Sequence, residues 1–142
     1  MAEPDDQFEL VRFVRAQELD YERAVTELRT GHKRTHWMWH VFPQFDGLGI
    51  SPRSVEFAIK SRAEAIAYLA HPILGPRLLE CCEVIVGLGD YSVIEIFGRP
   101  DDLKLHSCIT LFAQISSHAV FQQVLDKYFD GRLDERTLQL LA

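Results

Sequence analysis

Apolar residues recur at intervals of three and four along most of the chain, which is the period of an amphipathic α-helix. Two groups near the N-terminus, within residues 10–14 and 21–28, are separated by polar residues. They predict two short helices. Gly31 follows the second group, and we expect it to end that helix because glycine adopts a positive φ without strain.

Paired Ser and Glu residues mark where later helices begin. Ser61 and Glu64 have the spacing of a capping box, so a helix is predicted from about this point up to His71, which Pro72 follows. Its apolar face is expected to consist of Ala63, Ile66, Ala67 and Ala70. The next predicted helix covers residues 74–86. Because both flanks of its apolar stripe are also apolar, we expect it to lie at the centre of the fold.

Four more helices are predicted in the C-terminal third. A second Ser-x-x-Glu box opens a short helix at Ser92, and Gly98 ends it. A longer helix opens at Pro100, and two others cover residues 121–128 and 135–141. The segments that are rich in β-branched residues lie inside these longer helical patterns, so they are not predicted to be strands.

These patterns predict an all-α fold. We expect a single compact multi-helical domain of about seven short helices that spans residues 1–142, with its core at about 8–141. The sequence contains no internal repeat, no low-complexity segment and no linker long enough to separate two domains.

Composition limits the classes of function. The formal net charge of -6 argues against broad binding to nucleic acid or to anionic membranes, which depends on an excess of Lys and Arg. The acidic N-terminus is unlike a signal peptide, and no apolar run approaches the roughly 20 residues that span a bilayer. Three cysteines, two of them adjacent, make a poor disulfide framework. We therefore expect a soluble cytoplasmic protein with buried cysteines; the sequence leaves the oligomeric state open.

The stretch KRTHWMWHVFPQFDGLG, residues 33–49, is the most unusual segment of the chain. It holds both tryptophans, Trp37 and Trp39, and no acid lies between Glu27 and Asp46. Three cations give it a local positive charge: Arg29, Lys33 and Arg34. Either this is a solvated basic turn, or it binds an anion with the help of a short helix that Thr35 caps. A tryptophan could also stack on a ligand.

Histidines recur every four residues in this region, at His32, His36 and His40. A pair of histidines on one helical face can bind zinc, but a third ligand is missing, and the cysteines lack ligand spacing. We therefore predict no metal and no cofactor. His36 is the candidate general acid or base. Gln44 lies in the apolar loop that follows, where its amide needs a backbone or ligand partner.

Two further segments place polar residues in apolar surroundings. His71 and Arg77 flank the turn before a buried helix, where a cation is unfavourably close to the helix N-terminus unless an acid or a bound anion is near. Lys104 and Ser107 lie one helical turn apart on one side of a later helix, which could equally be a solvent face. No Ser-His-Asp arrangement can be traced through these residues.

Three motifs, KxTHWMWxxFPQxxGLG, EAxAYLxHPxLGxRL and FGxPDxLKLxSxxTLF, closely resemble a bacterial domain-of-unknown-function family, number eighteen-ten. The resemblance covers residues 8–141 and implies a compact helical fold with no established activity. Some members are labelled calpastatin, but calpastatin-type inhibitors are disordered and this composition is that of a packed globule. The motif positions here are Lys33, His36, Trp37, Trp39, Gln44, Gly47, Gly49, His71, Arg77, Lys104, Ser107 and Thr110. His106 and Cys108 depart from the pair of serines that members often carry.

Two hypotheses about function follow. In the first, the domain binds a small anionic ligand, nucleotide-like or phosphorylated, in a pocket that joins the tryptophan-rich stretch to Arg77 and Lys104. Its catalytic version is hydrolysis of an ADP-ribose-type N-glycoside. The segment AIAYLAHPILGPRL faintly resembles the I-x-x-x-P-x-x-x-x-R segment of the helical family that acts on such compounds. In the second, the domain is a protein-interaction module that uses an aromatic surface patch and catalyses nothing. Whether the chain is an enzyme stays open.

Overall fold

The structure, a computed structural model, describes residues 6–142. The first five residues, on which part of the argument against a signal peptide rests, lie outside this range. The described residues form nine α-helices and no β-strand, which confirms the all-α fold but exceeds the predicted count of about seven. The helices are α1 (Val11–Arg29), α2 (Met38–Val41), α3 (Pro52–Glu56), α4 (Arg62–Ala70), α5 (Leu74–Val86), α6 (Val93–Phe97), α7 (Asp101–Ile115), α8 (Ala119–Phe129) and α9 (Glu135–Leu141).

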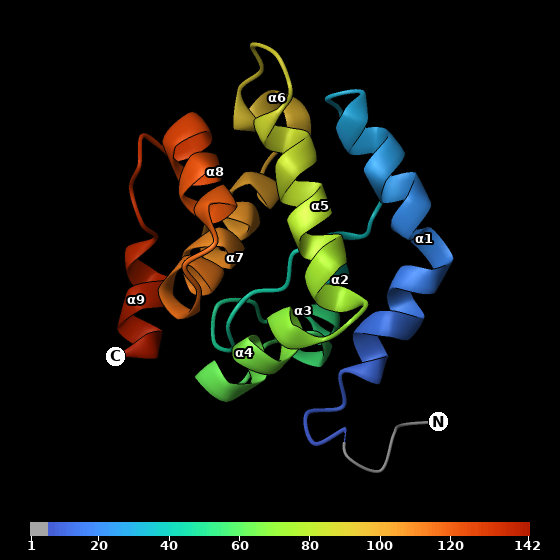
Figure 1. Ribbon diagram of the computed structural model, residues 1–142, viewed down its shortest axis with the longest axis vertical. Helices are drawn as coiled ribbons and strands as arrows, with labels where there is room; N and C mark the ends of the chain where they lie inside the picture. Colours follow the sequence, from blue (N-terminus) through green and yellow to red (C-terminus); the bar gives the residue numbers. More distant parts are fainter. Residues whose placement is uncertain (1–5) are drawn as a thin grey trace.

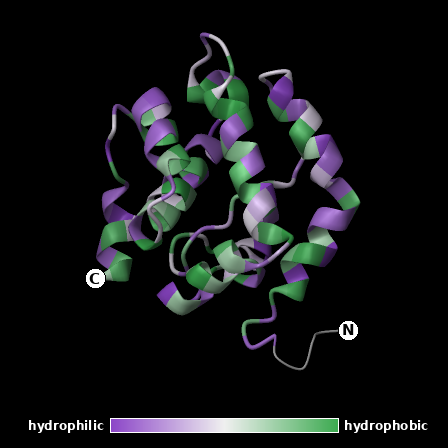
Figure 2. Cartoon of the chain, in the orientation of Figure 1, coloured by the Kyte–Doolittle hydropathy of each residue, from purple (hydrophilic) through white to green (hydrophobic). Residues whose placement is uncertain are grey.

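Helix α5 lies at the centre, as predicted, and its bounds match the predicted ones (Figure 1). It packs against α1, α4 and α8, while α7 packs against α4, α6, α8 and α9. Hydrophobic and hydrophilic residues alternate around the long helices, as amphipathic packing requires (Figure 2). All three cysteines are buried in the core, and none forms a disulfide. No helix in the described part of the chain has the length and apolarity needed to cross a bilayer.

The N-terminal helix is one continuous element rather than the two that the apolar groups predicted. The polar residues between the groups contain no Gly or Pro, so nothing interrupts the helical hydrogen bonds. Two of them, Gln17 and Asp20, are buried and bonded to other elements. Gly31 follows the helix with a φ of 75°, which confirms its predicted role at the C-terminal end.

Helix α4 buries a different face from the one predicted. Ala65 and Tyr68 are fully buried, whereas Ile66 is 53% exposed. The reason is Glu64, whose carboxylate pairs with Arg12 at 2.7 Å and accepts a hydrogen bond from the backbone N–H of Lys60. This buried ion pair turns the flank that carries Glu64 inward. Ser61 caps the helix as predicted, by accepting from the backbone N–H of Glu64.

The tryptophan-rich stretch contains less helix than predicted, and the loop after it contains more. Helix α2 has only four residues, and Thr35 does not cap it, because the Thr35 hydroxyl donates to Glu27 instead. Helix α3 was not predicted, although Ser51 caps it and Pro52 occupies its first turn, which is a recognised start signal. The capping box at Ser92 is formed in both directions.

Candidate functional site

The carboxylate of Glu27 is enclosed by neutral hydrogen-bond donors of residues 34–37. This side chain is buried, and its carboxylate accepts hydrogen bonds from the backbone N–H groups of Arg34 and Thr35, at 2.8 and 3.1 Å. It also accepts from the Thr35 hydroxyl at 2.6 Å and from the Trp37 indole N–H at 2.9 Å. The backbone N–H groups of Arg34 and Thr35, which an anionic ligand could otherwise have used, are therefore already bound to a carboxylate of the chain.

The hydrogen bonds to Glu27 change its acidity. Burial by itself would raise the pKa of this carboxyl, because it disfavours the charged form. The donors named above outweigh burial, with the Thr35 hydroxyl contributing most, and lower the pKa of Glu27 from 4.5 to about 2. The carboxylate is thus ionised at any ordinary pH and holds residues 34–37 in one conformation.

Lys33 and Trp37 are also satisfied inside the protein. The Lys33 ammonium is 2.8 Å from a carboxylate oxygen of Asp101, donates to the Thr35 carbonyl at 2.6 Å and lies 5.0 Å from the centre of the Trp37 ring. Its side chain is 7% exposed, and Trp37 is fully buried. Neither residue is open to a ligand. Phe42 is fully buried too, whereas Trp39 and Phe45 of the same stretch are half-buried.

Three of the predicted site residues, Gln44, Lys104 and Ser107, do come together. They line a concavity of about 450 Å³, which we call the Lys104 concavity, between the loop before α3, the first half of α7 and the start of α9. Neither the Gln44 amide nor the Lys104 ammonium forms a hydrogen bond with another described residue. Lys104 instead lies 3.8 Å from Asp101 and 5.2 Å from the centre of the Trp39 ring.

Two glycines of the predicted motif lie in the loop beside this concavity, and Gly49 lines it. Gly47 has a φ of 100°, which residues with a Cβ rarely adopt. Gly49 allows Ser54 to approach so closely that an added Cβ would lie 2.4 Å from the Ser54 Cβ. Both glycines therefore serve the path of the loop that carries Gln44.

Ser107 and Thr110 attach α9 to α7. The Thr137 hydroxyl donates to Asp134, and the Ser107 and Thr137 hydroxyls are 3.2 Å apart. The Thr110 hydroxyl accepts from the backbone N–H of Asp134 at 2.9 Å. These bonds fix the edge of the Lys104 concavity, and they engage the Asp134 carboxylate in capping α9.

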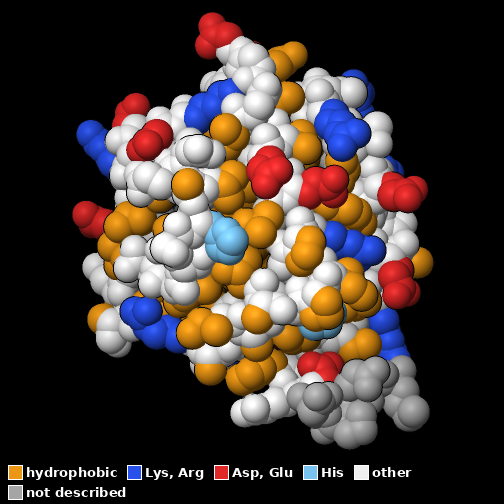
Figure 3. Space-filling model, viewed as in Figure 1, with side chains coloured by type: hydrophobic (Ala, Val, Ile, Leu, Met, Phe, Trp, Pro, Cys, Tyr) orange, Lys and Arg blue, Asp and Glu red, His pale blue; other side chains and the backbone are white. Residues whose placement is uncertain are grey.

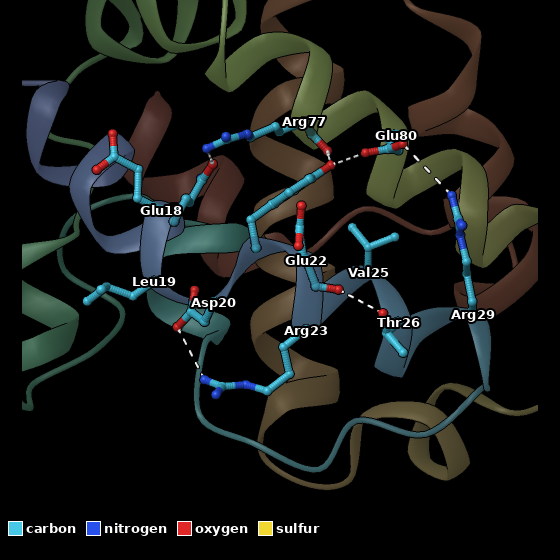
Figure 4. Close-up of a pocket in the computed structure, with 12 residues that line it drawn as sticks. Glu18, Leu19, Asp20, Glu22, Arg23, Val25, Thr26, Arg29, Arg77 and Glu80 are labelled. Atoms are coloured by element: carbon cyan, nitrogen blue, oxygen red, sulfur yellow. Dashed lines mark hydrogen bonds and ion pairs between the residues drawn. The ribbon is translucent and has the colours of Figure 1, made fainter.

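Arg77 lines a different concavity, so the predicted grouping of Arg77 with Lys104 is wrong. This second hollow, the Arg77 concavity, has a volume of about 730 Å³ and lies between α1 and α5 (Figure 4). The Arg77 guanidinium lies 4.7 Å from the centre of the Tyr21 ring, and its Nη1 is 3.4 Å from the Gln17 side-chain oxygen. Its other charged lining residues are Glu18, Asp20, Glu22, Arg23, Arg29 and Glu80.

Sequence reasoning missed the polar residues beneath the Arg77 concavity. His40 is buried, and its Nε2 lies 2.9 Å from both oxygens of Asp20. The Gln17 amide donates to the His40 carbonyl at 2.6 Å and to the Tyr68 hydroxyl at 3.1 Å. Burial raises the pKa of Tyr21, whose hydroxyl donates to Glu80. The available signal was the presence of Gln17 and Asp20 between two apolar groups on what proved to be one helix.

The remaining predicted residues lie apart from both concavities. His36 is exposed, and its ring forms no hydrogen bond with a described residue. His71 has a local role, because its Nδ1 accepts from the backbone N–H groups of Ile73 and Leu74 at the start of α5. Burial raises the pKa of Cys81 to about 12 and so keeps this thiol protonated. Within residues 6–142 no group of three or more His, Cys, Asp or Glu is placed to hold a metal ion.

Comparison with known proteins identifies relatives without naming an activity. The model of a family described as "Protein of unknown function (DUF1810)" matches residues 7–141. The crystal structure of the conserved hypothetical protein Rv1873 from Mycobacterium tuberculosis is 52% identical, with a TM-score of 0.94 over 96% of this chain and 98% of that one. No curated protein matches significantly. Neither description carries the calpastatin label.

Proposed function

Since the chain belongs to the DUF1810 family, whose description names no activity, we propose a function from the geometry of the site: binding of a small anionic molecule, nucleotide-like or phosphorylated, in the Lys104 concavity. One observation carries the proposal. The Lys104 ammonium and the Gln44 amide line the same hollow, and neither has a hydrogen-bond partner among the described residues. Partly buried polar groups without partners favour a ligand that supplies them.

The charges around this concavity support an anion rather than a cation. Lys104 and Arg136 line it together with a single carboxylate, Asp134. That carboxylate already caps α9 through the backbone N–H and the hydroxyl of Thr137. Lys104 has only a loose pair with Asp101, at 3.8 Å, and Arg136 forms no ion pair with a described residue. Two weakly compensated cations therefore face the hollow, in a protein whose formal net charge is -6. Arg53, whose guanidinium lies 5.5 Å from the centre of the Trp39 ring, adds a third cation nearby.

The other side of the concavity is apolar and suits the body of such a ligand. Ile50 is 97% exposed and Leu103 is 56% exposed, and both line the hollow. Exposed aliphatic side chains beside polar groups without partners are typical of small-molecule sites. A flat base or sugar against these side chains would leave its phosphate near Lys104, which fits the nucleotide-like ligand.

The proposal extends to binding and stops short of catalysis. His36, the residue that the sequence offered as acid or base, is exposed and does not line this concavity. Hydrolysis of an ADP-ribose-type N-glycoside would need another residue in that role. Lys33 contributes indirectly, since it binds the Asp101 carboxylate whose second oxygen faces Lys104.

Tryptophan fluorescence tests the proposal. Trp37→Phe leaves Trp39, the neighbour of Lys104, as the only fluorophore of its kind. In a panel of nucleotides, ADP-ribose and sugar phosphates, we expect at least one compound to change the emission saturably. Lys104→Met in this background should lower the affinity for that compound at least tenfold, because it removes the ammonium in the hollow that is not hydrogen-bonded.

A matched lysine serves as the control. Lys60 is exposed and donates only to the Val55 carbonyl, so Lys60→Met should leave the affinity unchanged. If no compound of the panel changes either the emission or the melting temperature, the Lys104 concavity is not an anion site. The hypothesis that the domain is a protein-interaction module would then be favoured.

A further inference from the structure

The guanidinium of Arg77 is held in place, but most of its N–H groups have no hydrogen-bond acceptor in the described part of the chain. The group is stacked on Tyr21 and contacts Gln17 at 3.4 Å, which is its one side-chain hydrogen bond to a described residue. Of the five N–H donors of an arginine, most are therefore left without an acceptor. Within residues 6–142 no carboxylate lies within 4.0 Å of it, although four carboxylates line the same concavity. Figure 4 shows the side chain extending from α5 toward α1, near Glu18.

Arg12 shows what a satisfied arginine looks like in this protein. It also lies over an aromatic ring, that of Phe13 at 4.4 Å. Its guanidinium, however, forms five hydrogen bonds, four to backbone carbonyls and one to the buried carboxylate of Glu64. The contrast sets Arg77 apart as a fixed cation whose donors are available to something outside the chain.

A fixed carboxylate lies on the same side of α1. The Asp20 side chain is 10% exposed, and the buried ring of His40 holds both of its oxygens at 2.9 Å. Gln17 and Asp20 are three residues apart in a helix, which is an axial rise of about 4.5 Å. Arg77 contacts Gln17, and both Arg77 and Asp20 line the same hollow.

The charges around this hollow compensate one another poorly. Among its described lining residues, only two ion pairs fall within 4.0 Å, and both are at the limit: Arg23 with Asp20 at 3.9 Å and Arg29 with Glu80 at 4.0 Å. Positive and negative side chains lie close together on the α1 and α5 side of the surface (Figure 3). A simple anion would meet four carboxylates here, and a simple cation would meet three arginines.

We propose that the Arg77 concavity binds a zwitterion with the head group of an α-amino acid, whose carboxylate pairs with Arg77 and whose ammonium pairs with Asp20. The planar guanidinium fork matches a carboxylate in a bidentate manner. The Asp20 carboxylate receives one ring N–H from His40 and keeps lone pairs that can accept from an ammonium. This site is separate from the Lys104 concavity, so the inference does not depend on the function proposed above.

The rim indicates which amino acid fits best. Glu18 and Glu22 line the hollow, and neither forms an ion pair with a described residue. A ligand whose side chain carries a positive charge would pair with one of them after its head group is bound. Among the common amino acids, L-arginine and L-lysine meet this requirement, and L-arginine offers the larger planar donor.

Isothermal titration calorimetry with three matched compounds tests the proposal on the full chain. L-arginine carries both head groups, agmatine lacks the carboxylate, and 5-guanidinopentanoic acid lacks the α-amino group. We expect saturable binding of L-arginine and at least tenfold weaker binding of each analogue. The proposal is overturned if agmatine binds as tightly as L-arginine, or if none of the twenty common amino acids binds at millimolar concentration.

Variants locate the site. Arg77→Lys keeps the charge but loses the planar guanidinium, so it should lower the affinity for L-arginine at least tenfold. Arg132 lies in an exposed loop, and Arg132→Lys should leave this affinity unchanged. Asp20→Asn should weaken L-arginine and leave 5-guanidinopentanoic acid, which has no α-ammonium, unaffected. If Asp20→Asn does not fold because His40 loses its partner, Glu22→Gln combined with Glu18→Gln replaces it. That variant should lower the preference for L-arginine over L-alanine, and an unchanged preference together with an unchanged Arg77→Lys would refute the proposal.

Discussion

Arg12 and Arg77 lie in two regions with similar side chains, but the two guanidinium groups differ in how many hydrogen bonds they form. Each arginine starts from a helix, lies over an aromatic ring and has carboxylates close by. Near Arg12 the chain supplies an acceptor for every side of the guanidinium, including the carbonyls of Glu56 and Ala58 from another segment. Near Arg77 it supplies one amide oxygen. The first region holds the fold together, and in the second most N–H groups of the guanidinium have no acceptor among the described residues.

The same contrast separates the two lysines that share Asp101. Lys33 binds one carboxylate oxygen at 2.8 Å and is 7% exposed, whereas Lys104 lies 3.8 Å from the other and is 22% exposed. A motif residue can therefore be structural or available for binding, and charge alone does not distinguish the two. What distinguishes them is the number of hydrogen bonds that each side chain already makes.

The largest expected effect follows from a substitution at Arg12, whose guanidinium is fully hydrogen-bonded. Arg12→Met should lower the free energy of unfolding by about 3–5 kcal/mol, because it leaves the buried Glu64 carboxylate without its cation. Urea denaturation followed by circular dichroism measures this loss. Arg15→Met is the control, since Arg15 is exposed one turn away and such surface changes stay within about 0.5 kcal/mol. Equal losses in both variants would contradict the contrast.

The second prediction concerns acid. The folded pKa of Glu27 is lowered from 4.5 to about 2, so its stabilising contribution is complete above pH 4.5 and disappears as the pH falls toward 2. This shift corresponds to roughly 3 kcal/mol of unfolding free energy. The measurement is urea denaturation at several values of pH between 6 and 2.

Glu27→Gln isolates that contribution from those of other carboxyl groups. The variant should be less stable at neutral pH, because an amide cannot accept from all the donors around it. Its stability should then fall less steeply with acid, so that the two curves converge near pH 2. Parallel curves would mean that Glu27 is not the group that titrates.

A smaller effect separates the two lysines. Lys33→Met should cost about 2 kcal/mol, because it removes a buried charged hydrogen bond to Asp101. Lys104→Met should cost less than about 1 kcal/mol, as is usual for a loose pair near the surface. Thermal unfolding of both variants gives the comparison. If Lys104→Met is the more damaging change, then Lys104 belongs to the framework of the fold and the proposed anion site loses its main cation.

Much of the fold could be predicted because its signals are local. The apolar stripe of α5 and the reciprocal cap at Ser92 depend on residues within a few positions of each other. The errors arose where a distant partner changed the outcome. Arg12 turns the flank of α4 inward through Glu64, and Glu27 takes the hydroxyl that was expected to cap α2.

The candidate sites were harder to predict for the same reason. Lys33 seemed free because its partner, Asp101, belongs to α7, which lies far along the chain. Gln44 and Lys104 were selected as polar residues in apolar surroundings, and only tertiary structure joins them in one concavity. Arg77 was selected on its unfavourable place near a helix start, and its separation from Lys104 could not be deduced from spacing.

The smallest expected effect on stability follows from a substitution at Arg77, which completes the comparison with Arg12. Arg77→Met should change the free energy of unfolding by no more than about 1 kcal/mol, because the native contacts that it loses are one stacking interaction and one long hydrogen bond. The methylene groups of methionine keep part of the packing on Tyr21. Chemical denaturation beside Arg12→Met gives the comparison, and a loss of 3 kcal/mol or more, as expected for Arg12, would mean that Arg77 is part of the framework. A small loss, together with the loss of L-arginine binding in Arg77→Lys, would mean that the guanidinium is held in place for a ligand.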